Sequence, residues 1–426
     1  MFKHIYFMLF LCLAAIANFA TAQTTNNDTL KLNIQQAEKI FMDKNLSILA
    51  AKYNIDAYLA LVSQAKKWDN PTLNIDENIY NQYTKKYFDN TSTGQTYVQV
   101  QQLIKLGGKR KASVAIAKDN YEIAKLQLDD LLRNLRLTLH SDLFNAKNFI
   151  EADKLFADET TELEKLANAI GEQVKVGNAA AKDLLRVQAD LFSTKNDRLQ
   201  NQKQLIDVEA ELRQLLMLPE NAYVMPMVSD SISSAAVEKL DAGSLFLIAK
   251  DNRSDFKIQQ MQTQQQQHNV DLQRAGEVPD LTLGPEFDHN SNYITDYWGL
   301  AISMPLPILN TNRKNVKAAK SFLSQSQEQQ MQLEKNVATD VTSAVQKLKS
   351  SATLNENVSE NLGKKYDEML NNMLLNYRQR NLSLLELMDF FDTYKDTKLK
   401  ALQLINDTHN AIEEVNFSVG KSIIAQ

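Results

Sequence analysis

The chain has 426 residues, with only 11 glycines and 7 prolines, and a formal net charge of −5. This mild negative charge argues against nucleic-acid binding, and the mean hydropathy of −0.37 argues against a protein built mainly of membrane helices. The scarcity of helix-breaking residues favours long helices.

Residues 1–22 are predicted to be a signal peptide that is removed on export. Lys3 and His4 precede an apolar run over 5–16, and an A-x-A cleavage pattern follows at Ala20–Ala22. The run is too short for a spanning helix, although a retained anchor is the alternative. The single cysteine, Cys12, follows Leu11 rather than a small residue, which argues against lipid attachment. The cleaved chain has no cysteine and therefore no disulfide.

Residues 23–218 are predicted to form a first helix–hairpin–helix repeat. Apolar residues recur every three or four positions over 32–68, which predicts a helix that Pro71 ends. Apolar and polar residues then alternate around Leu73–Ile79 and again from Tyr97, which predicts two strands joined by a polar loop.

A very long helix is predicted next. Residues 109–175 contain no proline and one glycine, so they predict a single helix of about 65 residues, or about 100 Å. The triplet Val176-Gly177-Asn178 predicts a turn, and a helix of about 38 residues then ends at Pro219. Helices this long indicate a coiled coil or a helical assembly.

The remaining chain is predicted to be a linker over 219–243 and a second repeat over 244–426. The order of elements is the same: a helix over 245–275, strands near 281–287 and 298–304, a helix over 312–376, a turn at Arg380-Asn381, and a last helix to about 420.

The two repeats match at fixed offsets, which indicates an internal duplication. Asn178 and Asn381 lie 203 positions apart, and so do Leu184 and Leu387. Earlier in each repeat the offset is 208, because the first predicted hairpin loop is five residues longer.

Four strands per chain cannot close a membrane barrel, and an open edge cannot face lipid. The chain is therefore expected to share a barrel with copies of itself; two copies give eight strands and a filled interior, and three give twelve strands and room for a pore. The predicted fold is therefore mainly α with a small β portion.

Aromatic residues cluster around both predicted hairpins. Aromatic side chains favour the boundary between membrane and water, so a membrane girdle is predicted, with ordinary loop packing as the alternative. Its members would be Tyr80, Tyr97, Tyr293, Tyr297 and Trp298.

No catalytic or metal-binding pattern is found. The five histidines are scattered without ligand spacing, and Gly107-Gly108-Lys109 lacks the spacing of a phosphate-binding loop. We therefore expect no enzyme activity, no metal site and no cofactor.

The order of elements and several short motifs resemble the TolC-type outer-membrane efflux factors, over about residues 30–420. Ile34–Glu38 resembles the opening helix of that family, and Leu106–Arg110 resembles its heavy-metal branch, which is associated with RND-type pumps. Val176–Asn178 followed by Asp183–Leu185 resembles its periplasmic tip pattern.

The resemblance implies a homotrimer in the outer membrane, in which a long periplasmic α-helical barrel continues into a 12-stranded trimeric transmembrane β-barrel. It also implies tips that dock on a periplasmic adaptor protein and an inner-membrane pump. It assigns Tyr377 to a lock that closes the tip, and Glu386 and Asp389 to an acidic ring at the narrowest opening. Their spacing of three places both carboxylates on one helix face, although a solvated face is the alternative. The tip residues expected to lock or to contact the adaptor are Val176, Gly177, Asn178, Asp183, Tyr377, Arg380 and Asn381.

Three residues depart from the family pattern. Arg380 stands where the family usually has a glycine, Leu382 stands where a locking arginine is common, and Arg186 stands at the position equivalent to Asp389. The first tip is therefore not expected to duplicate the acidic ring.

The function expected from this resemblance is that of a passive exit duct for small molecules or metal cations in a tripartite exporter. A type I protein-secretion duct of the same fold and a periplasmic coiled-coil scaffold are the two alternatives.

Overall fold

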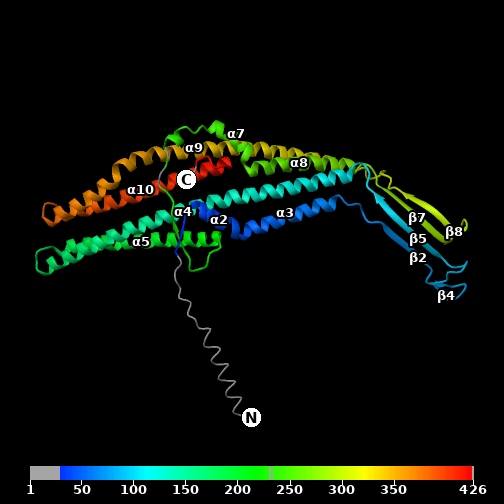
Figure 1. Cartoon of the computed structure of the whole chain (residues 1–426), viewed down its shortest axis with the longest axis horizontal. Helices are drawn as coiled ribbons and strands as arrows, with labels where there is room; N and C mark the ends of the chain where they lie inside the picture. Colours follow the sequence, from blue (N-terminus) through cyan, green and yellow to red (C-terminus); the bar gives the residue numbers. More distant parts are fainter. Residues whose placement is uncertain (1–28, 230–231, 233, 425–426) are drawn as a thin grey trace, which may run out of the picture. The chain divides into compact units, whose positions relative to one another are not determined.

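The computed structural model describes residues 29–424, apart from 230, 231 and 233. The predicted signal peptide and Cys12 lie outside the described residues. The two very long helices are confirmed, as are the medium helices that follow them (Figure 1). They are α4 (Lys109–Lys175), α5 (Ala181–Leu216), α9 (Arg313–Arg378) and α10 (Leu384–Val419). A membrane-spanning helix is not found among the described residues.

The opening helix of each repeat is broken in two, which corrects both predictions. In the first repeat the break is at Asn45, whose side-chain oxygen accepts hydrogen bonds from the backbone N–H groups of Ser47 (2.9 Å) and Ile48 (3.4 Å). This is an N-cap, and it starts a new helix without proline or glycine. In the second repeat the break is at Arg253, 208 positions later, with a similar extended backbone (φ −65°, ψ 118°). The resulting helices are α2 (Ile34–Lys44), α3 (Leu46–Ala65), α7 (Ala242–Asn252) and α8 (Ser254–Ala275).

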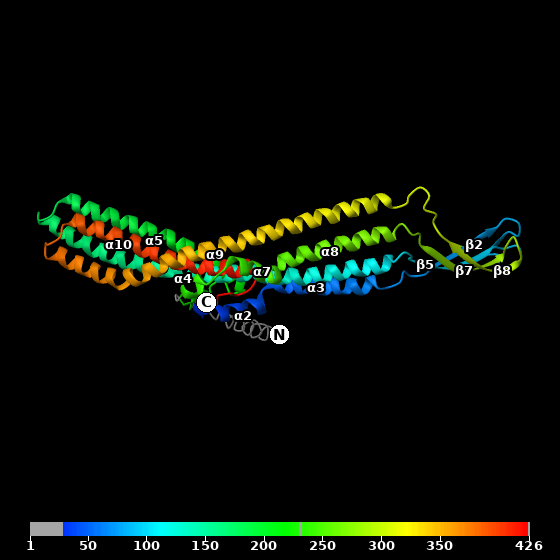
Figure 2. The ribbon, with the colours of Figure 1, turned by 90° about the horizontal axis from the view of Figure 1, so that it is seen from above.

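The two predicted hairpins join into one antiparallel sheet of four strands. The strand order is β2-β5-β7-β8, so the repeats meet where β5 pairs with β7. In Figure 2 the helices α3, α4, α8 and α9 lead to the sheet in the same order as their strands. Among the described residues, the outer strands of the sheet, β2 and β8, each have a partner on one side only. The four strands are β2 (Thr72–Glu77), β5 (Thr96–Ile104), β7 (Leu281–Asn290) and β8 (Thr295–Ser303).

Two regions expected to be irregular contain short elements. The predicted first hairpin loop holds the small pair β3 (Tyr80–Asn81) and β4 (Lys86–Tyr87). The predicted linker holds β6 (Tyr223–Pro226) and α6 (Ser234–Glu238), and β6 pairs in parallel with β1 (Thr29–Leu32). The pairing of β1 with β6 joins segments almost 200 residues apart, so local periodicity could not reveal it.

The chain divides into two compact units that are not the two sequence repeats. Of the described residues, one unit combines 29–44, 142–229 and 373–402, and the other combines 45–141, those within 232–372, and 403–424. The second unit has a core in which α7, α8, α9 and α10 contribute buried apolar side chains, among them Phe256, Val341, Leu348, Ile412 and Val415. Each unit therefore needs segments from both repeats.

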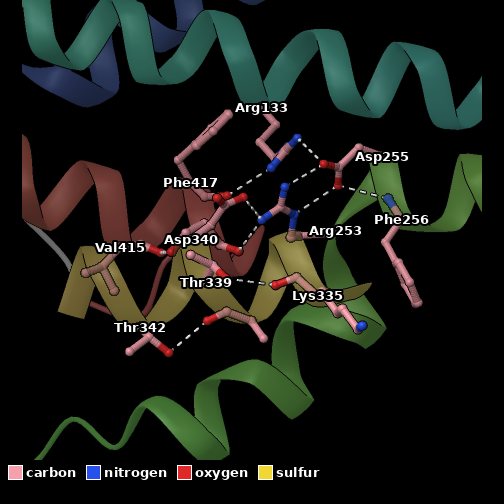
Figure 3. Close-up of polar contacts among 12 residues, drawn as sticks. Arg133, Arg253, Asp255, Phe256, Lys335, Thr339, Asp340, Thr342, Val415 and Phe417 are labelled. Atoms are coloured by element: carbon pink, nitrogen blue, oxygen red, sulfur yellow. Dashed lines mark hydrogen bonds and ion pairs between the residues drawn. The ribbon is translucent and has the colours of Figure 1, made fainter. Parts of the chain in front are cut away.

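A buried ion network surrounds Arg253 in the second unit (Figure 3). The Arg253 side chain donates two hydrogen bonds to the carboxylate of Asp255, Nε to Oδ1 at 3.0 Å and Nη2 to Oδ2 at 2.6 Å, and a third to Asp340 at 2.9 Å. Arg133 of α4 approaches Asp255 at 3.3 Å and donates to the Phe417 carbonyl at 3.1 Å. The network thus ties the α7–α8 break to α4, α9 and α10.

Candidate functional site

The first helix turn closes α4 with a glycine in the left-handed conformation. Gly177 has φ +78°, and the Asn178 N–H donates to the Gln173 carbonyl at 2.8 Å. The Gly177 N–H donates to the Val174 carbonyl at 3.0 Å. These two bonds form a Schellman motif, which satisfies carbonyl groups that the end of a helix leaves without partners. Val176, Gly177 and Asn178 are all exposed, as residues at a contact surface would be.

The second turn repeats this geometry without the glycine. Arg380 occupies the left-handed position with φ +63°, and the Asn381 N–H donates to the Asn376 carbonyl at 2.9 Å. The Arg380 N–H donates to the Tyr377 carbonyl at 2.9 Å. A residue with a side chain is strained by about 1–2 kcal/mol in this conformation. The second turn therefore carries backbone strain at Arg380 that Gly177 avoids in the first turn.

Glu386 has a structural role that the sequence analysis missed. Its carboxylate accepts hydrogen bonds from the backbone N–H of Ser383 at 2.9 Å and from the Ser383 hydroxyl at 2.6 Å, and its own N–H donates to that hydroxyl at 3.3 Å. This is a capping box at the start of α10, and the S-x-x-E spacing could have revealed it. The bonds from Ser383 lower the pKa of Glu386, so the carboxylate is ionised at neutral pH.

Tyr377 and Asp183 place the two helix turns within electrostatic range of each other. Tyr377 is half-buried near the end of α9, and Asp183 lies in the first turn of α5. Burial raises the pKa of the Tyr377 hydroxyl, and the charge of Asp183 raises it further. The residue assigned to the lock therefore lies within electrostatic range of the other tip, and Glu386 and Asp389 are both exposed on α10.

Two further acidic residues lie on the same side of α10 as Glu386 and Asp389. Asp392 and Asp396 follow on α10 at spacings of three and four, which place them within about one third of the helix circumference. The Asp392 side chain is 58% exposed and has Lys395 at 3.4 Å. The spacing was readable from the sequence, but these two residues were not among those predicted.

Two buried carboxyl groups lie in the same unit. Glu159 on α4 is 5% exposed, and burial raises its pKa to about 7, with Lys395 opposing that shift and Asp392 adding to it. Asp142, also on α4, is 5% exposed; burial and the charge of Glu211 raise its pKa to about 7. Both groups are partly protonated at neutral pH.

One face of the sheet is apolar and exposed. The register aligns Leu73 with Val100 and Ile75 with Val98, and it aligns Phe287 with Trp298. The Phe287 and Trp298 rings lie 5.1 Å apart. Exposed residues of this face include Leu73 (60%), Ile75 (63%), Trp298 (74%), Leu300 (66%) and Ile302 (65%). An exposed apolar surface of this extent is typical of contact with lipid or protein.

The opposite face of the sheet carries a polar network. Glu286 accepts hydrogen bonds from the Tyr97 hydroxyl at 2.9 Å and from the Gln99 side chain at 3.0 Å. The register aligns Tyr97 and Tyr297 with Asp288, so both tyrosines share this polar face, whereas Trp298 lies on the apolar one. Two other aromatics assigned to the girdle lie near the loops and pack in tilted ring pairs. The ring centroids of Tyr80 and Tyr87 are 5.0 Å apart, and those of Tyr293 and Tyr297 are 5.9 Å apart.

Within residues 29–424, leaving out 230, 231 and 233, no cluster of three or more His, Cys, Asp or Glu side chains is arranged to hold a metal ion. The candidate site thus consists of acidic residues at the helix turns and of a sheet with one apolar and one polar face.

The model of the outer membrane efflux protein family matches residues 40–216 and 247–418. The chain belongs to this family. The family resemblance inferred from the sequence is thus confirmed, and the family is one of outer-membrane channels rather than of enzymes.

Individual relatives agree with this assignment. The outer membrane efflux protein described here is 20% identical over 417 residues to the cobalt-zinc-cadmium resistance protein CzcC of Cupriavidus metallidurans, a match that covers 95% of this chain and 96% of that protein. Among solved structures, CusC matches with a TM-score of 0.72 at 17% identity, over 91% of this chain and 92% of that one. The open state of the MtrE outer membrane channel of Neisseria gonorrhoeae matches with a TM-score of 0.73 at 18% identity, over 92% and 89%. The structural likenesses show a shared fold.

Proposed function

We propose that three copies of this outer membrane efflux protein form the passive exit duct of a tripartite exporter. Their twelve strands close one transmembrane barrel, and their long helices form a tunnel that continues from it into the periplasm. An inner-membrane pump supplies the energy, and a periplasmic adaptor protein connects the pump to the helix turns at 176–178 and 380–381. Residues 1–22 direct export and are removed.

The four-stranded sheet carries this proposal. Its exposed apolar face suits lipid, and its polar face around Glu286 suits a water-filled interior. In the part of the chain that the structure describes, β2 and β8 each lack a partner on one side. Three copies would pair these edges and leave none facing lipid. Trp298 on the apolar face is the best placed member of the proposed membrane girdle, with Tyr80 and Tyr293 near the loops, whereas Tyr97 and Tyr297 would face the interior.

The cargo that the charges favour is cationic. Three copies of Glu386 and Asp389 would form a ring of carboxylates, and such rings attract cations. The name of the relative CzcC, a cobalt-zinc-cadmium resistance protein, agrees with metal cations as cargo. The family match argues against a soluble periplasmic scaffold, which osmotic shock would release, whereas a duct would stay with the outer membrane. The other alternative, a type I protein-secretion duct, has the same fold and would be distinguished by the inner-membrane pump with which it works.

Planar-bilayer recordings of the purified mature protein test the ring. Substituting Glu386→Gln and Asp389→Asn together removes the charge but keeps the cap, because Gln is also accepted at the third position of a capping box. We expect the Zn²⁺ concentration for half block to rise at least about tenfold, which corresponds to about 1.4 kcal/mol.

Asp183→Asn is the matched control, since Asp183 is the equivalent of Glu386 in the first repeat and Arg186 takes the position equivalent to Asp389. It should leave the block by Zn²⁺ unchanged. A ring variant that blocks and conducts like the unmodified protein would remove Glu386 and Asp389 from the constriction, and a protein that forms no trimer and no pore would refute the duct itself.

A further inference from the structure

A basic cavity lies at the corner where the first hairpin meets its helices. Its volume is about 590 Å³, and it opens between the end of α3 and the start of α4. Among the described residues, no acidic side chain lines it. Its lining includes five cationic side chains and one aromatic ring, those of Lys66, Lys105, Arg110, Lys111, Lys118 and Trp68.

Most of these cations lack an acidic partner. Lys105 forms an ion pair with Asp69 at 2.9 Å, and Arg110 lies over the Trp68 ring at 4.0 Å. By contrast, Lys109, which is not among the residues that line this cavity, forms an ion pair with Asp280 at 2.6 Å. Within the part of the chain that the structure describes, no carboxylate lies within ion-pair distance of the other cavity cations, Lys66, Arg110, Lys111 and Lys118.

The start of α4 increases the positive potential of the cavity. Its first turn carries Lys109, Arg110 and Lys111 and contains no acidic residue, although the positive end of a helix dipole favours anions. Gly108 precedes them with φ +84° and open space around the position of a Cβ, so the backbone there is accessible. An arrangement that opposes a local rule without an internal compensation indicates a functional site.

The second repeat provides a comparison. The corresponding corner, between the end of α8 and the start of α9, also has a cavity. That cavity is lined by Glu277 and Asp280 and by the apolar segment 305–309, and Lys109 is the one cationic residue among the described residues that line it. The concentration of unpaired positive charge is therefore particular to the first corner and is not a general property of the strand-to-helix connection.

We propose that the basic cavity binds the phosphate group of an anionic phospholipid headgroup at the membrane boundary. The cavity lies just beyond the ends of β2 and β5, where the headgroup layer would begin if the strands cross the bilayer, so the inference rests on the proposed function. Basic pockets beside membrane segments bind anionic lipid headgroups, and Trp68, which is 58% exposed, is the type of side chain that favours this layer. One lipid per chain would place a negative charge among the cations that the protein leaves unpaired.

Tryptophan fluorescence can test the site, because the chain has only two tryptophans, Trp68 and Trp298. In full-length mature protein carrying Trp298→Phe, delipidated in a neutral detergent, dihexanoyl phosphatidylglycerol should change the Trp68 emission in a saturable manner. Dihexanoyl phosphatidylcholine should not, since its headgroup has no net charge. Sodium phosphate is the third ligand: if it saturates the change as tightly as the anionic lipid does, the site belongs to free phosphate and the lipid proposal is wrong.

Three lysines of the cavity can be neutralised without breaking an ion pair. The triple variant Lys66→Gln, Lys111→Gln and Lys118→Gln should bind the anionic lipid roughly a hundred-fold more weakly, given the usual contribution of each cation near a charged membrane. A matched triple variant of exposed lysines elsewhere, Lys182→Gln, Lys203→Gln and Lys335→Gln, should bind normally. Equal affinity in the two triple variants, or no saturable change in the parent, would overturn the proposal.

Lipid binding by the basic cavity and pore formation by the duct can be measured independently of each other. The short-chain lipid is soluble and reaches the cavity whether or not the sheet crosses a membrane. Outer-membrane fractionation and pore formation, measured on the same proteins, report on the proposed function independently of the cavity.

Discussion

Replacing Arg253 with methionine should destabilise the protein through a single identifiable network. The substitution keeps a long side chain in a position that is 4% exposed but removes the hydrogen bonds to Asp255 and Asp340. Breaking a buried ion pair from one side usually costs about 3–5 kcal/mol, because the remaining charge has no partner. Here Asp255 keeps Arg133 at 3.3 Å, and the Asp340 side chain is 50% exposed and can be hydrated. We therefore expect a smaller loss, of about 2–3 kcal/mol in the free energy of unfolding.

The loss should depend on pH. Burial raises the pKa of Asp255, but the bonds from Arg253 and the charge of Arg133 outweigh it and hold the pKa below its usual value. A carboxyl group with a lowered folded-state pKa stabilises the fold above its unfolded-state pKa, about 4, and loses that contribution as the pH falls through the folded-state pKa. The difference between the parent and Arg253→Met should therefore be full at pH 7 and shrink below about pH 4.

Urea unfolding in detergent, followed by far-ultraviolet circular dichroism at pH 7 and pH 3, measures both effects. Arg274→Met is the matched control, because Arg274 lies on α8, the helix that begins directly after Arg253, but its side chain is 53% exposed and has Asp271 only at 3.7 Å. It should cost less than about 1 kcal/mol. If Arg253→Met costs no more than Arg274→Met, or if its cost is the same at both pH values, the network does not stabilise the fold as described.

Two further predictions concern backbone strain and buried charge. Arg380→Gly should stabilise the second turn by about 1 kcal/mol, and Gly177→Ala should destabilise the first turn by a similar amount. Hydrogen exchange of the turn amides should become slower in Arg380→Gly and faster in Gly177→Ala. Unchanged exchange rates would contradict this prediction. Asp142 has a raised pKa of about 7, so its folded state holds a proton that the unfolded chain releases, and stability should fall as the pH rises from about 4 to about 7. Asp142→Asn should flatten this dependence in thermal unfolding between pH 5 and 8, and an unchanged slope would exclude Asp142 as its cause.

Much of the fold could be predicted because the relevant information is local and repeated. The absence of proline over 109–175 and the apolar spacing predicted α4, and the duplication carried the same pattern to α9. The breaks at Asn45 and Arg253 could not be predicted from periodicity, because the helices on both sides keep the same apolar spacing. Only the hydrogen bonds of the Asn45 side chain, or the ion pairs of Arg253, show why the chain turns there.

The candidate site residues were also only partly predictable from the sequence. Gly177 could be recognised as a turn residue from its type, whereas Arg380 was located by the repeat offset and its strained backbone is visible only in the structure. The face on which an aromatic side chain lies depends on strand register, which separated Trp298 from Tyr97 and Tyr297. The basic cavity could not be predicted, because the fold brings Lys66 and Trp68 beside residues more than 35 positions later in the chain.

The discontinuity of the two compact units has a consequence for biogenesis. Segments 373–402 and 403–426 complete the first and the second unit, respectively, and the core of the second includes Ile412, Val415 and Val419 from α10. A polypeptide translocated from its N-terminus would thus have both hydrophobic interiors unfinished until the last helix emerges. Such a nascent chain exposes aggregation-prone surface for the whole of its passage, so it should require a holding chaperone. Truncation within α10 should yield a misfolded product rather than a shortened channel.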